Sequence, residues 1–205
     1  VSMYTGLWKE RFIYGRWVAA SGSIYPFFNE DIHVVDTSPL RNQCEYYYLG
    51  IDFGTKNPTT GMLIGFTKDK RMIVLKEYFW SPEQQAGREK TTNEFADDMA
   101  NFLSNNSILN CKIVIDPSAS TLILSLKNRF RTANTKTTII KGDNEILEGI
   151  ATINNLFEKN QILIDKSCKN HIREIQSYSW AKNEKPKKEF DHTLDAFRYC
   201  SNLLF

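Results

Sequence analysis

The segment Tyr48-Leu-Gly-Ile-Asp-Phe-Gly54 decides the fold of this chain. It closes a run of aromatic and branched residues, Tyr46 to Phe53, which is typical of a central strand buried on both faces. Such runs normally end on Gly, Asn or Ser, because a carboxylate must be hydrated, paired or bound to a metal. Here the run ends at Asp52, so we expect that this carboxylate has a specific partner.

Two further acids stand in comparable positions. Asp116 ends the short apolar strand in Cys111-Lys-Ile-Val-Ile-Asp-Pro117. Asp195 lies in Asp191-His-Thr-Leu-Asp-Ala-Phe-Arg-Tyr199, which predicts a C-terminal helix. If the two strands are parallel neighbours, Asp52 and Asp116 meet at one edge of the sheet, where open α/β sheets gather their ligands. The helix can then lean across the strand ends and add the third acid.

The rest of the chain alternates strand and helix signals. Further strands are expected at Gly61–Phe66, Met72–Phe79, Thr137–Lys141 and Ile162–Ile164. Helices are expected over 91–104, 117–130, 144–158 and 170–178, where apolar residues recur at helical spacing. This order predicts an α/β fold with a mixed sheet of five or more strands: an antiparallel three-strand meander followed by parallel strands, with helices on both faces.

Length and composition favour a single domain of moderate size. The 205 residues are 41% apolar, which is enough for one core. The net charge is only +2, so a polyanionic partner would have to be held by a local basic patch. The four cysteines are far apart and indicate reduced core residues. No run reaches the roughly 18 apolar residues of a membrane span and no signal peptide is recognisable, so we expect no membrane partner and a cytosolic protein.

The first 44 residues differ from the remainder. Aromatic residues are scattered among loop signals there, whereas the pattern becomes regular from Glu45. We therefore expect a linker or the tail of a preceding domain over 1–44 and one folded domain over 45–205. Since the first residue is Val, the chain is expected to be a piece of a longer protein.

The three acids suggest metal-dependent hydrolysis of a phosphodiester. Two divalent ions roughly 3.5 to 4 Å apart can activate a water and compensate developing charge. Mg²⁺ and Mn²⁺ accept hard oxygen ligands, which Asp52, Asp116 and Asp195 could supply. His192, three residues before Asp195, could ligate a softer ion, orient the attacking water or donate to a phosphate oxygen.

Each of these residues also has an ordinary structural interpretation. Asp52 could stabilise a turn, and Asp116 could cap the next helix. Asp191 is better placed for a helix N-cap than for a metal ligand. His192 could be a surface or packing residue. The sequence leaves open whether Asp191 joins the site. It also leaves open whether an acid joins it from the helix expected after the third strand, which carries Glu94, Asp97 and Asp98.

Basic residues near the presumed site are candidates for contacting nucleic acid. A cluster of lysines directly precedes the Asp191 helix, and one more follows Asp52 in its turn: Lys182, Lys185, Lys187, Lys188 and Lys56. Such a cluster can equally be a solvated loop. Next to the acids, it would suit contacts with the phosphates of a DNA duplex, which position a substrate without reading its sequence.

Four stretches together resemble the C-terminal nuclease domain of bacteriophage terminase large subunits, a family with an RNase H-like fold. They are Leu49-Gly-Ile-Asp-Phe-Gly54, Val114-Ile-Asp-Pro-Ser-Ala119, Glu148-Gly-Ile150 and Asp191-His-Thr-Leu-Asp-Ala-Phe-Arg-Tyr199. The likeness covers about residues 45 to 205, and the last motif is the most specific. Residues 7 to 35 look like the segment that joins a packaging ATPase domain to the nuclease.

The resemblance implies an endonuclease that cuts concatemeric double-stranded viral DNA in the cytoplasm of the infected bacterium. It implies two Mg²⁺ or Mn²⁺ ions on Asp52, Asp116 and Asp195, with His192 at the metal site. The partners implied are the terminase small subunit, the portal protein and an N-terminal ATPase domain. No Gly-x-x-x-x-Gly-Lys-Ser/Thr phosphate loop occurs here, so this chain itself should not hydrolyse ATP.

Three other functions are compatible with parts of the sequence. Another RNase H-like nuclease, such as a Holliday-junction resolvase or an integrase, would share the first two motifs. An actin-like ATPase lobe would share Gly50-Ile-Asp-Phe-Gly-Thr55, but it needs a second such turn and a second lobe. A DNA-binding module without catalysis is disfavoured, because uncompensated carboxylates would repel phosphate.

Overall fold

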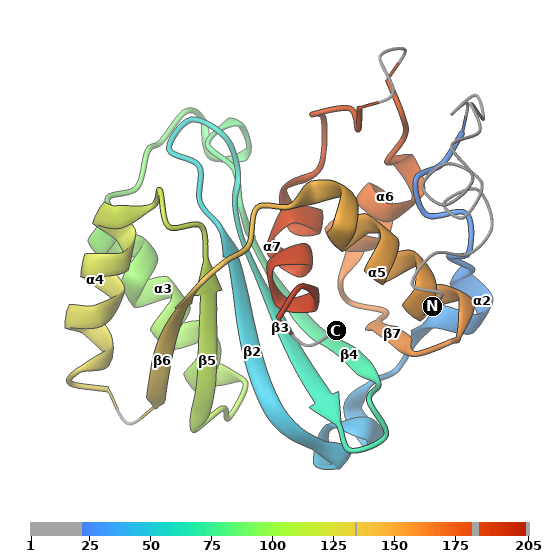
Figure 1. The fold of residues 1–205 in the computed structure, drawn as a ribbon. Coiled ribbons are helices and arrows are strands. Elements are labelled where there is room, and N and C mark those ends of the chain that lie inside the picture. The colour runs from blue at the N-terminus through green and yellow to red at the C-terminus, as the bar shows by residue number, and fades with distance from the viewer. Residues whose placement is uncertain (1–21, 134, 182–184, 204–205) are drawn as a thin grey trace.

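A seven-stranded mixed sheet forms the centre of the computed structural model, which describes residues 22–133, 135–181 and 185–203. Its strand order is β1-β7-β4-β3-β2-β5-β6 (Figure 1). In that order the strands are β1 (Val34–Val35), β7 (Ile162–Asp165), β4 (Met72–Trp80), β3 (Thr59–Thr67), β2 (Cys44–Asp52), β5 (Asn110–Ile115) and β6 (Lys136–Lys141).

The strand directions match the predicted topology. Strands β2, β3 and β4 form the antiparallel meander. Strands β5 and β6 continue the sheet in parallel on one side, and β7 pairs in parallel with β4 on the other. The expectation of a mixed α/β sheet with a meander followed by parallel strands is therefore confirmed.

Helices cover both faces of this sheet (Figure 1). On one face, α3 (Thr92–Asn105) and α4 (Ser120–Phe130) pack over a core that includes Leu49 and Ile51 of β2. On the other face lie α5 (Ile146–Glu158), α6 (Lys169–Ser177) and α7 (His192–Ser201). Short helical turns complete the chain: α2 (Glu30–His33), η1 (Ser38–Gln43) and η2 (Glu83–Gln85).

Strand β3 shows why the sheet needs two layers of helices. All nine of its residues are buried. Because side chains alternate between faces, Met62 and Ile64 enter the core on the α7 side, whereas Leu63 enters the core on the α3 side. An apolar strand of this kind is stable only when both faces are covered.

Residues 23–43 pack against the same sheet, although the sequence placed them in a linker. Ile24 and Tyr25 are 1% and 3% exposed and belong to the core on the α7 side. The Thr37 hydroxyl donates to Asp165 at the end of β7 over 2.7 Å, and β1 pairs in parallel with that strand. This part of the chain is thus continuous with the domain. A preceding domain joined through residues 1–44 stays a prediction.

The four cysteines are free thiols, and Cys111, Cys168 and Cys200 are buried, as expected for reduced core residues. Among the described residues, no helix combines the length and apolarity that crossing a bilayer requires.

Candidate active site

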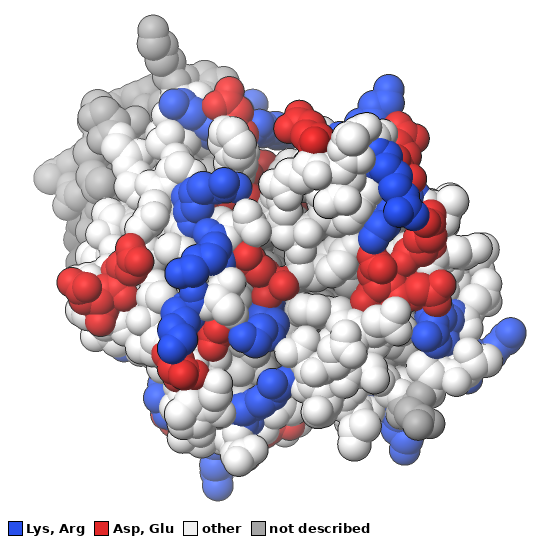
Figure 2. All heavy atoms as spheres, turned by 180° about the vertical axis from the view of Figure 1, so that it is seen from behind, with Lys and Arg blue, Asp and Glu red and all other residues white. Residues whose placement is uncertain are grey.

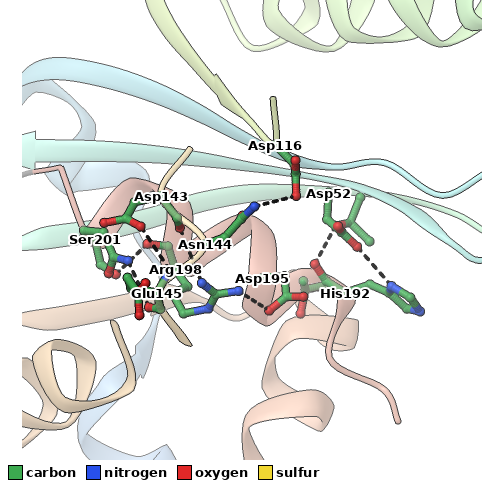
Figure 3. A network of polar contacts seen from close by, with 12 residues as sticks. Asp52, Asp116, Asp143, Asn144, Glu145, His192, Asp195, Arg198 and Ser201 are labelled. Carbon is green, nitrogen blue, oxygen red and sulfur yellow. Dashed lines mark hydrogen bonds and ion pairs between the residues drawn. The ribbon is translucent and has the colours of Figure 1, made fainter. Parts of the chain in front are cut away.

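Asp52 and Asp116 lie side by side at one edge of the sheet. Strands β2 and β5 are parallel neighbours, and Ile51 pairs with Ile115 in their register. The next residue of each strand is an aspartate, so both carboxylates emerge at the same end (Figure 3). This juxtaposition follows directly from the two apolar runs in the sequence.

Helix α7 brings Asp195 and His192 to this edge because Gly50 lets it pack directly against β2. A β-carbon on Gly50 would stand 2.9 Å from the carbonyl carbon of Ala196 and closer still to its oxygen. The first turn of α7 is also fixed to β3, since the Thr60 hydroxyl donates to the His192 carbonyl over 2.9 Å.

His192 and Asp52 form a hydrogen-bonded ion pair. The His192 Nδ1 lies 3.0 Å from Asp52 Oδ2, and the side chains are 23% and 18% exposed. Burial raises the pKa of Asp52, although the hydrogen bond from His192 opposes this, and the charges of Asp195 and Asp116 raise it further. The same hydrogen bond raises the pKa of His192, which favours the imidazolium form.

Asp116 is held by a turn and by an amide. Its Oδ1 accepts from the Ser118 backbone N–H over 2.7 Å, and its Oδ2 accepts from the Asn144 side chain over 3.0 Å. Burial tends to raise the pKa of Asp116, but these hydrogen bonds outweigh it and lower the pKa. Ala119, not Asp116, is the N-cap residue of α4.

Asp195 is paired with a buried arginine on its own helix. The Arg198 guanidinium lies 2.7 Å from Asp195 Oδ1, and its side chain is only 4% exposed. A buried cation needs such a partner, because an unpaired charge in the interior is costly. Arg198 therefore compensates the charge of Asp195 in the metal-free protein.

The remaining acids are placed differently from one another. Asp191 occupies the N-cap position of α7, yet its side chain makes no capping hydrogen bond. Burial, reinforced by the charge of Asp195, raises its pKa to about 6. The acids on α3 lie on the opposite face of the sheet and are paired there: Glu94 with Arg88, Asp97 with Arg129 and Asp98 with Lys90.

The three candidate ligands, Asp52, Asp116 and Asp195, lie near one another but do not form a complete metal-binding site. Within the described part of the chain, no three Asp, Glu, His or Cys side chains stand close enough together to hold an ion. Asp52, Asp116 and Asp195 instead turn towards His192, Asn144 and Arg198, respectively (Figure 3). The donor set of carboxylate oxygens and one imidazole suits Mg²⁺ or Mn²⁺. Binding would require these side chains to exchange their protein partners for the ion.

The candidate DNA-binding lysines are exposed where they are described. Lys56 lies in the turn that follows Asp52. Lys185, Lys187 and Lys188 lie in the loop before α7, which is tied back by hydrogen bonds from Ala181 N to Lys185 O and from Lys187 N to Ser179 O. Lys182 lies outside the described residues.

On the described part of the rear face, a band of Lys and Arg side chains runs beside several groups of Asp and Glu side chains, so both charges are present there (Figure 2). Exposed ion pairs such as Lys166 with Asp36, at 3.4 Å, neutralise part of the positive charge. This agrees with the small net charge and leaves any polyanion contact to local groups.

Sequence reasoning gave no role to Arg198 or Asn144. Arg198 follows Asp195 by three residues on a helix, a spacing that favours an ion pair and could have indicated it. Asn144 comes from the loop before α5, far from Asp116 in the sequence, and no local pattern indicates their contact.

Comparisons with known proteins agree on one family. Residues 49–203 match the family model described as the terminase RNaseH-like domain. The large terminase subunit of Escherichia phage T5 is 28% identical over 193 residues, which cover 87% of this chain and 41% of that protein. The solved large terminase of a thermophilic bacteriophage is 34% identical, with a TM-score of 0.84 over 99% of this chain and 51% of its own.

More distant structures share the fold. The P22 large terminase nuclease domain has a TM-score of 0.69 at 17% identity and covers 88% of this chain and 91% of its own. The large terminase nuclease of a second thermophilic phage, G20c, was solved with bound magnesium; it is 11% identical, with a TM-score of 0.60 over 90% of this chain and 98% of its own. It was also solved with cobalt and with zinc. This chain spans about half of the first thermophilic-phage terminase and less of the T5 protein.

Proposed function

Because this chain belongs to the terminase RNase H-like domain family, we propose that it is the nuclease of a DNA-packaging motor and cuts concatemeric double-stranded viral DNA. The observation that carries the proposal is the meeting of Asp52, Asp116, His192 and Asp195 at one end of the sheet, from three separate elements. The reaction is hydrolysis of a phosphodiester bond with the help of divalent ions.

The three acids Asp52, Asp116 and Asp195 would hold the ions. Two bound Mg²⁺ or Mn²⁺ ions would supply an activated water and compensate the charge of the leaving oxygen. The metal-bound forms of the G20c nuclease support a divalent ion here, and the oxygen-rich donor set supports Mg²⁺ or Mn²⁺.

His192 would act on the substrate side of the site. Its Nδ1 is engaged by Asp52, which fixes the ring and leaves Nε2 to orient a water or to donate to a phosphate oxygen. The hydrogen bond with Asp52 raises the pKa of His192, which favours the donating imidazolium form. Arg198 and Asn144 would release Asp195 and Asp116 when the ions bind.

The duplex would lie over this edge and contact the lysines on either side of it. Lys56 follows Asp52, and Lys185, Lys187 and Lys188 precede α7, so both groups flank the acids along the chain. Lys182 belongs to the same loop in the sequence. These contacts would bind phosphates and give no sequence specificity.

The partners of the whole motor are also proposals, because the chain spans only 41% of the T5 protein and 51% of the solved thermophilic-phage terminase. We propose an ATPase domain on the N-terminal side, joined through residues 1–44, with the small subunit and the portal protein as further partners. The site of action would be the cytoplasm of the infected host.

The test is nicking of supercoiled plasmid in Mn²⁺ by the wild type and by three single variants, Asp52→Ala, Asp116→Ala and Asp195→Ala. Each variant should lose cutting while keeping a cooperative thermal transition. Asp97→Ala, which removes an exposed acid of α3 on the other face, is the matched control and should cut normally. Undiminished cutting by all three site variants would refute the assignment.

A further inference from the structure

A buried carboxylate from another helix caps the N-terminus of α7. Glu174 of α6 is 1% exposed, and its Oε2 accepts from the Thr193 backbone N–H over 2.8 Å and from the Thr193 hydroxyl over 2.5 Å. The first N–H groups of a helix have no partner within the helix, and a negative charge there is favourable. Glu174 thus does for α7 what an N-cap side chain normally does.

The residue at the N-cap position does not perform this task. Asp191 makes no capping hydrogen bond with its side chain, and its carboxylate interacts electrostatically with Asp195, His192 and Asp52. The capping acceptor comes instead from a helix about twenty residues earlier in the chain. Thr193, the residue that Glu174 holds, stands directly after His192 and two residues before Asp195.

Glu174 is itself firmly placed. Its neighbour His171 is fully buried and approaches the Thr193 hydroxyl with Nδ1 at 3.0 Å, so the hydroxyl can accept from the ring while it donates to Glu174. Burial lowers the pKa of His171 to about 3, which keeps the ring neutral. The start of α6 is held by Glu77 of β4, which accepts from the backbone N–H groups of Asn170 and His171 over 2.9 and 2.8 Å.

These contacts connect the sheet to the site in two successive steps. Glu77 fixes α6 to β4, and Glu174 fixes α7 to α6. From the other side, the Thr60 hydroxyl holds the carbonyl of His192. The first turn of α7 is therefore held at two adjacent residues by groups from two different elements.

We propose that Glu174 is a positioning residue, which fixes the first turn of α7 and thereby sets where His192 and Asp195 stand relative to Asp52. The inference rests on the nuclease function proposed above. Burying a carboxylate is costly, and a helix can be capped by its own N-cap side chain at lower cost. Capping of α7 by Glu174 is explained if it leaves the Asp191 carboxylate without a capping role and fixes the position of His192.

The test compares Glu174→Gln with two variants of its partner. The glutamine side chain has the same size, but it carries no negative charge, so its hydrogen bonds with Thr193 are weaker than the charge-assisted bonds that a carboxylate accepts. Amide hydrogen exchange at residues 193–195 should become faster in the metal-free protein. Mn²⁺ affinity, measured by calorimetry, should fall on the order of tenfold, as is common when a group that orients a metal ligand is lost. In plasmid cleavage, kcat should fall while KM for DNA stays unchanged.

The partner variants distinguish positioning from general stability. Thr193→Ser keeps both donors and should behave like the wild type, whereas Thr193→Val loses the hydroxyl hydrogen bond and should show faster exchange and weaker Mn²⁺ binding than the wild type. Asp165→Asn is the matched control, because Asp165 is also a buried carboxylate, 4% exposed, that accepts hydrogen bonds from Thr37 and Ser167 away from the site. It should lower the melting temperature without changing exchange at 193–195 or Mn²⁺ affinity.

Two results would overturn the proposal. One is a Glu174→Gln variant with lower stability but normal exchange at 193–195 and normal Mn²⁺ affinity. The other is a Thr193→Val variant that matches the wild type in both measurements. Failure of the nuclease function would look different: the wild type itself would neither bind Mn²⁺ nor cut, whereas the exchange measurements would still report whether Glu174 holds α7.

Discussion

Replacing Gly50 by Ala should damage the site more than the fold. The new β-carbon would stand 2.9 Å from the Ala196 carbonyl carbon and from the Cys200 sulfur, where ordinary contacts begin near 3.4 Å, and the carbonyl oxygen is closer still. The obstacle is mainly helix backbone, which cannot rotate away as a side chain can. Helix α7 must therefore move outwards from β2 and carry Asp195 and His192 with it.

The size of the effect follows from this displacement. Overpacking of a well-packed interior costs about 1 to 3 kcal/mol. In a protein of this size each kcal/mol lowers the melting temperature by about 2 to 4 °C. A misplacement of about 1 Å at a reacting centre can cost on the order of 100-fold in rate. We therefore expect a loss of several degrees in melting temperature together with a loss of about two orders of magnitude in plasmid nicking.

The matched control is Gly61→Ala on β3, beside Ile51 of β2. Its β-carbon would meet the Met99 sulfur at 3.2 Å and the Leu49 Cδ1 at 3.4 Å, which are ends of flexible side chains on the opposite face of the sheet. Calorimetry and nicking in Mn²⁺ should show a small change for Gly61→Ala and a large one for Gly50→Ala. Equal nicking by the two variants would refute the argument that the contact of α7 with β2 places the site.

Three further predictions concern charge. Asp191→Asn should flatten the pH dependence of the melting temperature in the metal-free protein. Burial and the charge of Asp195 raise the pKa of Asp191 from 3.8 to about 6, so the wild type loses stability as the pH rises through this range. An unchanged pH dependence in the variant would contradict this explanation. Changing Lys185, Lys187 and Lys188 together to Ala should weaken DNA binding. The slope of log K against log salt, measured by fluorescence anisotropy, should fall in magnitude by about 0.9 per lost phosphate contact. An unaltered slope would mean that this loop is simply solvated. Mn²⁺ at 100 times its Kd should stabilise the wild type by about 2.7 kcal/mol, and a rise in melting temperature of equal size for Asp116→Ala would exclude Asp116 as a ligand.

The strand ends that carry Asp52 and Asp116 could be predicted because local pattern determines them. Each acid follows an apolar run of β-forming residues, and parallel pairing then places both at one edge. Strand β1 was not predicted, since it has only two residues and owes its place to pairing with β7, distant in the sequence. The integration of residues 23–43 into the fold was missed for the same reason.

The partners of the acids were harder to predict than the acids themselves. Asp191 has the residue type and position of an N-cap, so the sequence favoured that role, but Glu174 supplies the capping acceptor through tertiary contact. Asn144 reaches Asp116 only because the sheet brings their loops together. Local propensity identifies which groups need partners, whereas the three-dimensional fold decides which partners they receive.

The dispersal of the proposed site over β2, the end of β5 and α7 has a consequence for synthesis. A nascent chain that has not yet emerged beyond residue 195 contains two of the acids but cannot complete the constellation, and α7 has no place to dock until β2 and β3 are paired. Chains that end before residue 195, or in which α7 has not docked, are therefore expected to be inactive if the proposed site is correct. Cleavage by that site would require β2, β5 and α7 to be folded together.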